Sequence, residues 1–292
     1  MRKKKRSLLI VIFAISSLVV LNLQTVLAEK TNSENQEFPD KFMNIINGSD
    51  EIYGEGVPLE HLTEDDKSAI QPRFKSGGVD HTHQYILASA LYIIKNDKGS
   101  SILNTENNLE VLLVNTDWPD KLGNETDGGT FAGHFYDPGT GKNWLGQTSP
   151  TAKSRAIEYY NRAVESYKAG NVQTALVSLG RGTHYISDLN EPHHAANKTA
   201  VDSNHSAFEK YVDENRTSYK IMNNSLSASI YQTSIDSNLD TLIDRQAHSA
   251  KSLYQLAANE STYSSAANSS VKNAMTSVVQ YVYRFGKEVG IF

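Results

Sequence analysis

The chain has 292 residues, a formal net charge of −5 and no cysteine. The absence of cysteine excludes disulfides and thiolate ligands, so any bound metal must use His and carboxylate side chains. Without residues 1–28, which carry five basic residues and no acidic one, Lys plus Arg falls from 28 to 23 and the net charge from −5 to −10. Such an acidic surface repels phosphate backbones and argues against long nucleic acid as a partner.

Residues 1–28 have the pattern of a secretory signal peptide. Five basic residues precede an apolar run from Leu8 to Leu21, and a small-residue pattern predicts cleavage after Ala28. An uncleaved membrane anchor is the alternative, but the run is shorter than the ~20 residues that a spanning helix needs. We therefore expect a secreted, extracellular protein.

Residues 29–76 are polar and weakly periodic, which predicts a pro-segment or flexible arm. The patterning changes at Ser76-Gly77-Gly78, so one folded domain is expected over 77–292. Its apolar spacing predicts helices over 83–95, 108–115, 151–169, 172–188, 204–215, 236–259 and 269–285.

Residues 117–150 are rich in Gly, Asp, Asn and Pro, which predicts a long loop, and loops of this length are usually functional. Strand signals are sparse along the whole chain. The expected fold is all-α, a bundle of roughly seven to nine helices around an interior site.

Seven of the nine histidines fall between residues 81 and 205. His184 and Asp188 are four apart on one predicted helix, and His205 and Glu209 repeat this spacing on the next. Two such pairs aimed inward are suited to binding divalent metal in a bundle. For either pair alone a surface salt bridge is the alternative, which the intervening run Glu191-Pro192-His193-His194 makes less attractive.

Three sequence blocks resemble the bacterial zinc-dependent phospholipase C family. Residues 184–197 read HYISDLNEPHHAAN, residues 130–138 read TFAGHFYDP, and residues 205–213 read HSAFEKYVD. The resemblance spans about Gly77 to Asp213. It implies that 77–292 is a catalytic domain, a multi-helix bundle of the type shared with three-zinc single-strand nucleases.

The resemblance implies three Zn²⁺ ions and assigns their ligands as follows. The first zinc would be bound by Asp120, His134, His184 and Asp188, the second by His194, His205 and Glu209, and the third by His83 with Asp188 as a bridge. Asp120 would also be the catalytic general base, with Asp117 as the alternative at this position. The remaining histidines are expected not to be ligands: His61, His81, His193 and His248. Of these, His193 is expected to pack beside the ligands or to support them, and His61 and His248 are expected to lie at the surface.

The implied reaction is hydrolysis of phosphatidylcholine-type phospholipids to diacylglycerol and a phosphorylated headgroup. The expected partner is a phospholipid membrane surface or micelle, the expected form is a monomer, and no nucleic acid is expected. Phe131 matches an aromatic residue of the family's headgroup pocket, whereas Lys121 stands where the family has Tyr. A lysine repels quaternary ammonium, which predicts a weaker choline preference, unless Lys121 faces solvent in a shifted loop.

The chain departs from the family at the third zinc, because no Trp lies shortly before His83, where relatives have their mature N-terminus. Cleavage near Arg73, which would free Phe74 as a substitute, is a hypothesis. Two other functions stay open: a single-strand nuclease of the three-zinc type, and a catalytically impaired zinc scaffold that binds membranes.

Overall fold

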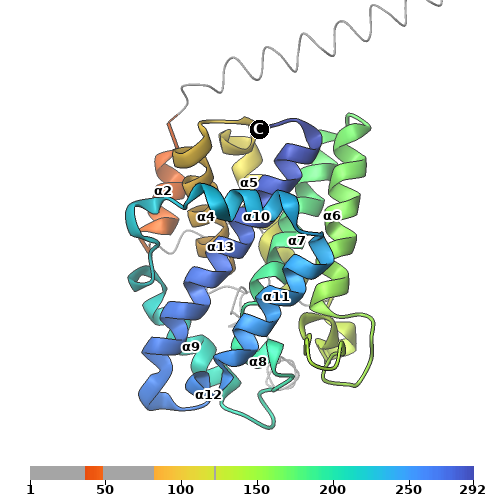
Figure 1. Ribbon diagram of the computed structural model, residues 1–292, viewed down its shortest axis with the longest axis vertical. Coiled ribbons are helices and arrows are strands. Elements are labelled where there is room, and N and C mark those ends of the chain that lie inside the picture. Colours follow the sequence, from red (N-terminus) through yellow and green to blue (C-terminus); the bar gives the residue numbers. More distant parts are fainter. Residues whose placement is uncertain (1–36, 49–81, 122) are drawn as a thin grey trace, which may run out of the picture.

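The computed structural model describes residues 37–48, 82–121 and 123–292 (Figure 1). Regular structure within these ranges is helical, apart from an isolated β-bridge between Asp137 and Lys142, which confirms the all-α prediction. The predicted signal peptide and most of the predicted arm lie outside the described residues, so the domain boundary after Ser76 stays a prediction. No helix in the described ranges has both the length and the apolar character needed to cross a bilayer.

The α-helices occur in the following order: α2 (Asp40–Ile46), α4 (Thr82–Lys98), α5 (Glu106–Asp117), α6 (Ala152–Lys168), α7 (Val172–Asp188), α8 (Pro192–Ala195), α9 (His205–Asn215), α10 (Ala228–Asp236), α11 (Leu239–Ser252), α12 (Tyr254–Ala257) and α13 (Tyr263–Val289). Beyond Asp117, which ends α5, the described residues of the predicted loop 117–150 form three 3₁₀ turns and the bridge between Asp137 and Lys142; the turns are η3 (Trp118–Asp120), η4 (Asp127–Gly129) and η5 (Ala132–His134). This loop connects α5 to α6.

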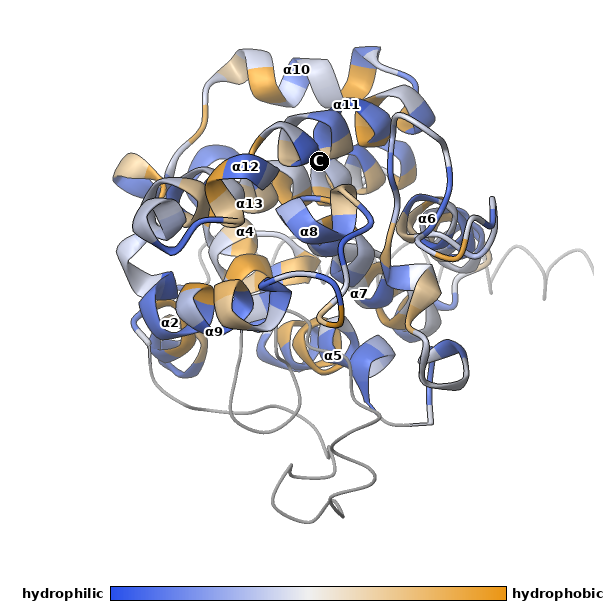
Figure 2. Cartoon of the chain, turned by 90° about the horizontal axis from the view of Figure 1, so that it is seen from below, coloured by the Kyte–Doolittle hydropathy of each residue, from blue (hydrophilic) through white to orange (hydrophobic). Residues whose placement is uncertain are grey.

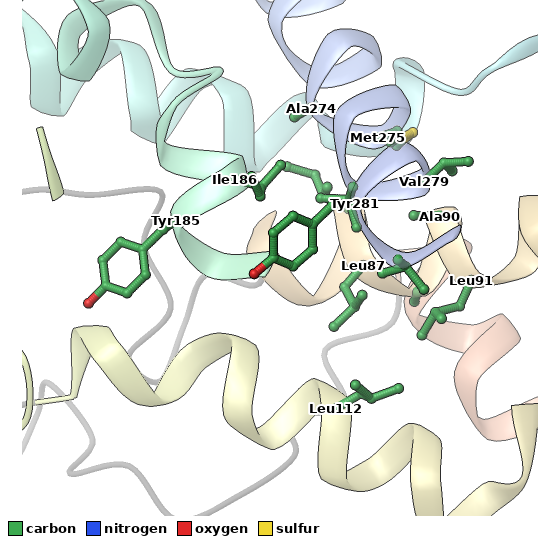
Figure 3. Close-up of a cluster of buried hydrophobic side chains, with 14 of the residues drawn as sticks. Leu87, Ala90, Leu91, Leu112, Tyr185, Ile186, Ala274, Met275, Val279 and Tyr281 are labelled. Carbon is green, nitrogen blue, oxygen red and sulfur yellow. The ribbon is translucent and has the colours of Figure 1, made fainter. Parts of the chain in front are cut away.

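The long helix α13 runs through the middle of the bundle (Figure 1). Its buried face combines small residues and valines with the large rings of Tyr263, Tyr281 and Phe285, and it packs against α4 and α7. Ala274 and Val279 of α13 lie in one cluster with Leu87 of α4 and Ile186 of α7 (Figure 3). Seen from below, the helices carry both hydrophobic and hydrophilic residues, as expected for amphipathic helices around a shared core (Figure 2).

Helix α7 has a central position, because it packs against α5, α6 and α13. The preceding helix α6 begins at a capping box: Ser154 N donates to Thr151 Oγ1 at 3.0 Å, and Thr151 N donates to Ser154 Oγ at 2.8 Å. It ends before Gly170, whose φ of +82° favours glycine and turns the chain back into α7. Because α7 is surrounded by α5, α6 and α13, its C-terminal turn is buried inside the bundle.

Helix α2 was not predicted from the sequence. Its side chains Phe42, Ile45 and Ile46 are buried against α4, and the ring of Phe38 lies 5.2 Å from that of Tyr92. Residues 38–46 are therefore part of the hydrophobic core, although they fall within the segment expected to be an arm.

Candidate metal centre

The eight predicted ligands come from six segments and are all buried, with at most 3% of any side chain exposed. They are His83 at the start of α4, Asp120 in η3, His134 in η5, His184 and Asp188 in the last turn of α7, His194 in α8, and His205 and Glu209 in the first turns of α9. The i,i+4 spacing of the two α7 residues places both on the buried face.

Asp188 lies at the middle of this group and contacts four imidazoles. Its Oδ2 is 3.0 Å from His134 Nδ1 and 3.2 Å from His184 Nε2. Its Oδ1 is 3.4 Å from His194 Nδ1 and 3.7 Å from His83 Nε2. Two ligands on one zinc ion lie about 3.4 Å apart for bonds of about 2.1 Å in tetrahedral geometry. The separations around Asp188 therefore fit shared metal ions.

Asp120 approaches three of the same imidazoles. Its Oδ1 is 3.5 Å from His134 Nδ1 and 3.6 Å from His184 Nε2, and its Oδ2 is 3.7 Å from His83 Nε2. The alternative residue Asp117 is also buried, but it accepts a hydrogen bond from Gln84 and belongs to none of the groups able to bind a metal.

A second set of donors forms where α8 meets α9. Glu209 Oε1 is 2.9 Å from His205 Nε2 and 3.6 Å from His194 Nε2. The two ring nitrogens of His194 and the two of His205 are buried, and none of them has a hydrogen bond of suitable angle in the described part of the chain, although carboxylate oxygens lie close by. Buried polar atoms are normally satisfied, and neutral imidazoles with carboxylates are the ligands that zinc prefers. The donors therefore fit a metal.

Three groups have ligand atoms within 4.8 Å of one another: His83, Asp120 and His184; His134, His184 and Asp188; and Glu191, His194 and His205. Glu191, which the sequence analysis did not assign to the site, occupies the place expected for Glu209 in the third group. Its Oε2 is 3.7 Å from His205 Nε2. The sequence signal for Glu191 was its position directly before Pro192, which is typical of a helix N-cap.

In His184 and His134, the ring nitrogen that faces away from the carboxylates contacts a backbone carbonyl, which orients the imidazole. His184 Nδ1 lies 2.8 Å from Thr116 O, which leaves its Nε2 facing the carboxylates. His134 Nε2 lies 3.1 Å from Glu125 O, which leaves its Nδ1 facing them. Metal-binding histidines in proteins usually donate their other N–H to a carbonyl or carboxylate in this way.

Burial and charge act in opposite directions on these side chains. Burial alone would raise the pKa of Asp188, but the charges of His184 and His194 hold it well below its usual value. Burial would lower the pKa of His184, whereas Asp188 and Asp120 raise it to about 9. Burial lowers the pKa of His205 well below its usual value. The buried carboxylates thus attract positive charge, which either a proton or a metal ion supplies.

The two predicted headgroup residues adjoin the centre. Phe131 is buried at 1% exposure, has an unusual φ of +50°, and its ring lies 5.6 Å from that of His134. Lys121 directly follows Asp120 and is partly exposed. Of the histidines expected not to be ligands, His248 is half-exposed near Asp244, whereas His61 and His81 lie outside the described residues.

An all-helical bundle that encloses adjacent groups of imidazoles and carboxylates defines a helical metalloprotein with a polynuclear centre. The family model described as "Zinc dependent phospholipase C" matches residues 82–253. The chain belongs to this family, and the family resemblance expected from the sequence is confirmed.

Individual relatives agree with this placement. The chain is 31% identical to a phospholipase C of Clostridium perfringens over 71% of its own length and 59% of that protein. It is 32% identical to a phospholipase C of Bacillus cereus over 47% of its length and 48% of that protein. Among solved structures, alpha toxin from Clostridium absonum superposes with a TM-score of 0.64 at 28% identity, covering 72% of this chain and 64% of that one. The chain thus spans about 59% of the clostridial relatives.

Proposed function

We propose that this chain is a secreted zinc phosphodiesterase that hydrolyses phospholipids of the phosphatidylcholine type to diacylglycerol and a phosphorylated headgroup. The observation that carries the proposal is the buried contact of Asp188 with four imidazoles, in a chain whose relatives are named phospholipase C. The partner is a membrane surface or micelle, and the active form is a monomer. Residues 77–292 form the catalytic domain behind a signal peptide and an arm, of which α2 packs on that domain.

The proposed ligands are those expected from the sequence. The distances around Asp188 and Asp120 support a first zinc on Asp120, His134, His184 and Asp188, and a third on His83 and Asp188. The contacts of Glu209 support a second zinc on His194, His205 and Glu209. The amine and carbonyl of the mature N-terminal residue would supply the remaining ligands of the third zinc.

Bound zinc ions supply a water of lowered pKa and a positive field for the oxygens of a phosphodiester. Asp120 is suited to accept the proton of the attacking water, because its carboxylate is buried among the three imidazoles described above. Phe131 would contact the headgroup beside His134, and Lys121 would weaken binding of a choline cation.

The test is an assay of the purified secreted protein on phosphatidylcholine micelles, with ethanolamine and anionic phospholipids and single-stranded DNA as competing substrates. We expect release of diacylglycerol that stops with a chelator and returns with Zn²⁺. His184→Ala should lower turnover more than about 100-fold, whereas the exposed control His248→Ala should not. Cleavage of DNA alone would support the nuclease, and zinc binding without turnover would support the scaffold.

A further inference from the structure

A network of hydrogen-bonded side chains joins α8 to α9 beside His194 and His205, the imidazoles of the proposed second zinc. Glu191 Oε1 is 2.8 Å from His193 Nδ1, and His193 Nε2 is 3.1 Å from Asn204 Oδ1. All three residues connect elements that carry the metal-binding histidines, and both Glu191 and His193 are fully buried.

The far end of this network is anchored on the C-terminal helices. Asn204 Nδ2 donates to Ala257 O at 2.9 Å and to Tyr263 Oη at 2.5 Å. Because the amide nitrogen faces a backbone carbonyl, the amide oxygen must face His193, which decides the orientation of this amide. The hydrogen-bonded network thus extends from Glu191, just after α7, to Ala257 of α12 and Tyr263 of α13.

His193 and Asn204 directly precede His194 and His205, the two imidazoles of the proposed second zinc. His193 precedes His194, and Asn204 precedes His205, so the contact between His193 and Asn204 sets the spacing of the following residues. The His193 ring is also stacked on the His205 ring, with centroids 5.1 Å apart and planes 19° apart. One side chain therefore constrains both histidines.

The contacts of Glu191 favour a supporting role, in which it holds His193 and the backbone of His194, over a role as a metal ligand. Its Oε2 accepts the backbone N–H of His194 at 2.6 Å, which caps α8, while its Oε1 faces His193. Both carboxylate oxygens already have short partners, and the contact with His205 is longer, at 3.7 Å. Glu209, at 2.9 Å from the same nitrogen, is the better placed ligand.

We propose that Glu191, His193 and Asn204 are positioning residues that set the separation of His194 and His205 and so tune the affinity of the second zinc. This inference rests on the proposed function, because it concerns a metal ion of that same centre. Supporting side chains of metal ligands typically contribute 10–100-fold to metal affinity.

The test is His193→Phe, which retains ring packing against Phe208 and Tyr254 but removes both hydrogen bonds. Zinc affinities would be measured by chelator competition, and the geometry of the second site by the visible spectrum of the cobalt-substituted protein. We expect one of the three zinc ions to bind about 10–100-fold more weakly, with an altered cobalt spectrum, while the other two bind as in the wild type.

The control is Val282→Ala, which creates a cavity in the core at a residue of α13 that is neither a proposed ligand nor a member of the Glu191–His193–Asn204 network. It should lower the Tm of the metal-free protein and leave all three zinc affinities unchanged. The proposal is overturned if His193→Phe binds three zinc ions with wild-type affinity, or if it weakens all three equally. A wild-type protein that binds no zinc would refute the proposed function itself, which the same titration reports separately.

Discussion

Gly182 of helix α7 lies against Tyr281 of α13. A Cβ atom at this position would lie 2.1 Å from Tyr281 Oη and 2.9 Å from its Cζ, and the Tyr281 hydroxyl already donates to Ala156 O at 2.7 Å. Alanine normally favours a helix over glycine by about 1 kcal/mol. Here we expect overpacking to outweigh that gain, because the Tyr281 ring is buried and its hydroxyl is hydrogen-bonded.

We expect Gly182→Ala to lower the free energy of unfolding by about 1–3 kcal/mol, measured by urea denaturation of the metal-free protein. Adding Tyr281→Phe should recover part of the loss, since it removes the closest atom. The control is Gly286→Ala, whose Cβ would meet only the terminal ring of Phe292. Equal stability of Gly182→Ala and wild type would contradict this account.

At the residue scale, the sequence predicted the donors and a supporting place for His193, but not its partners Glu191 and Asn204. The eight proposed ligands lie close together, and six of them come from the i,i+4 pairs and the blocks shared with the family, whereas His83 and Asp120 come from outside the quoted blocks. The role of Glu191 depends on Asn204 and on the helices beyond it, which are distant in sequence. Spacing along the chain does not reveal such contacts.

A partly buried ion pair links the loop before α6 to that helix. Arg155 Nη2 lies 2.5 Å from Asp127 Oδ1, and Asp127 Oδ2 accepts the N–H of Gly133 at 2.8 Å. Arg155 Nη1 also donates to Glu125 O at 3.2 Å, the carbonyl that lies beside His134 Nε2. The ion pair therefore positions the loop that carries His134.

We expect Arg155→Met to lower the free energy of unfolding of the metal-free protein by about 1.5–3 kcal/mol, because it leaves a mostly buried carboxylate without its charged partner. The matched control is Arg162→Met on the same helix, whose exposed pair with Glu158 should contribute less than about 1 kcal/mol. Urea midpoints give both values. Similar losses for the two variants would argue against a special role for Arg155.

At the element scale, the long periodic helices were predicted and most of the short ones were not, although α13 (Tyr263–Val289) extends beyond the predicted 269–285 at both ends. Helix α7 occupies 172–188 as predicted, because a continuous apolar stripe is bounded by Gly170 and Pro192. The nine-residue α10 was missed, and the helix predicted over 236–259 divides into α11 and α12 at Leu253. Short helices depend on tertiary contacts more than on their own periodicity.

At the scale of the whole molecule, the metal centre should contribute much of the stability. Cysteine is absent, and a cluster of charged and polar side chains occupies the interior of the bundle. A ligand present at 100 times its dissociation constant stabilises the folded state by about 2.7 kcal/mol per site.

For three zinc ions we expect a chelator to lower the Tm by roughly 15 °C or more, given about 2–4 °C per kcal/mol for a domain of this size. Calorimetry with and without chelator measures the difference, and Zn²⁺ but not Mg²⁺ should reverse it, because Mg²⁺ prefers oxygen ligands. An unchanged Tm would show that the buried cluster is stable without metal.

The contact of Asp188 with His83, His134, His184 and His194 has a consequence for how the ions load, since these imidazoles belong to all three groups of donors. A cation bound by any one of these imidazoles and Asp188 partly neutralises the Asp188 carboxylate, which then attracts a cation at a neighbouring imidazole less strongly. Occupancies in such an arrangement are thermodynamically linked, so filling is cooperative or anticooperative and not three independent equilibria.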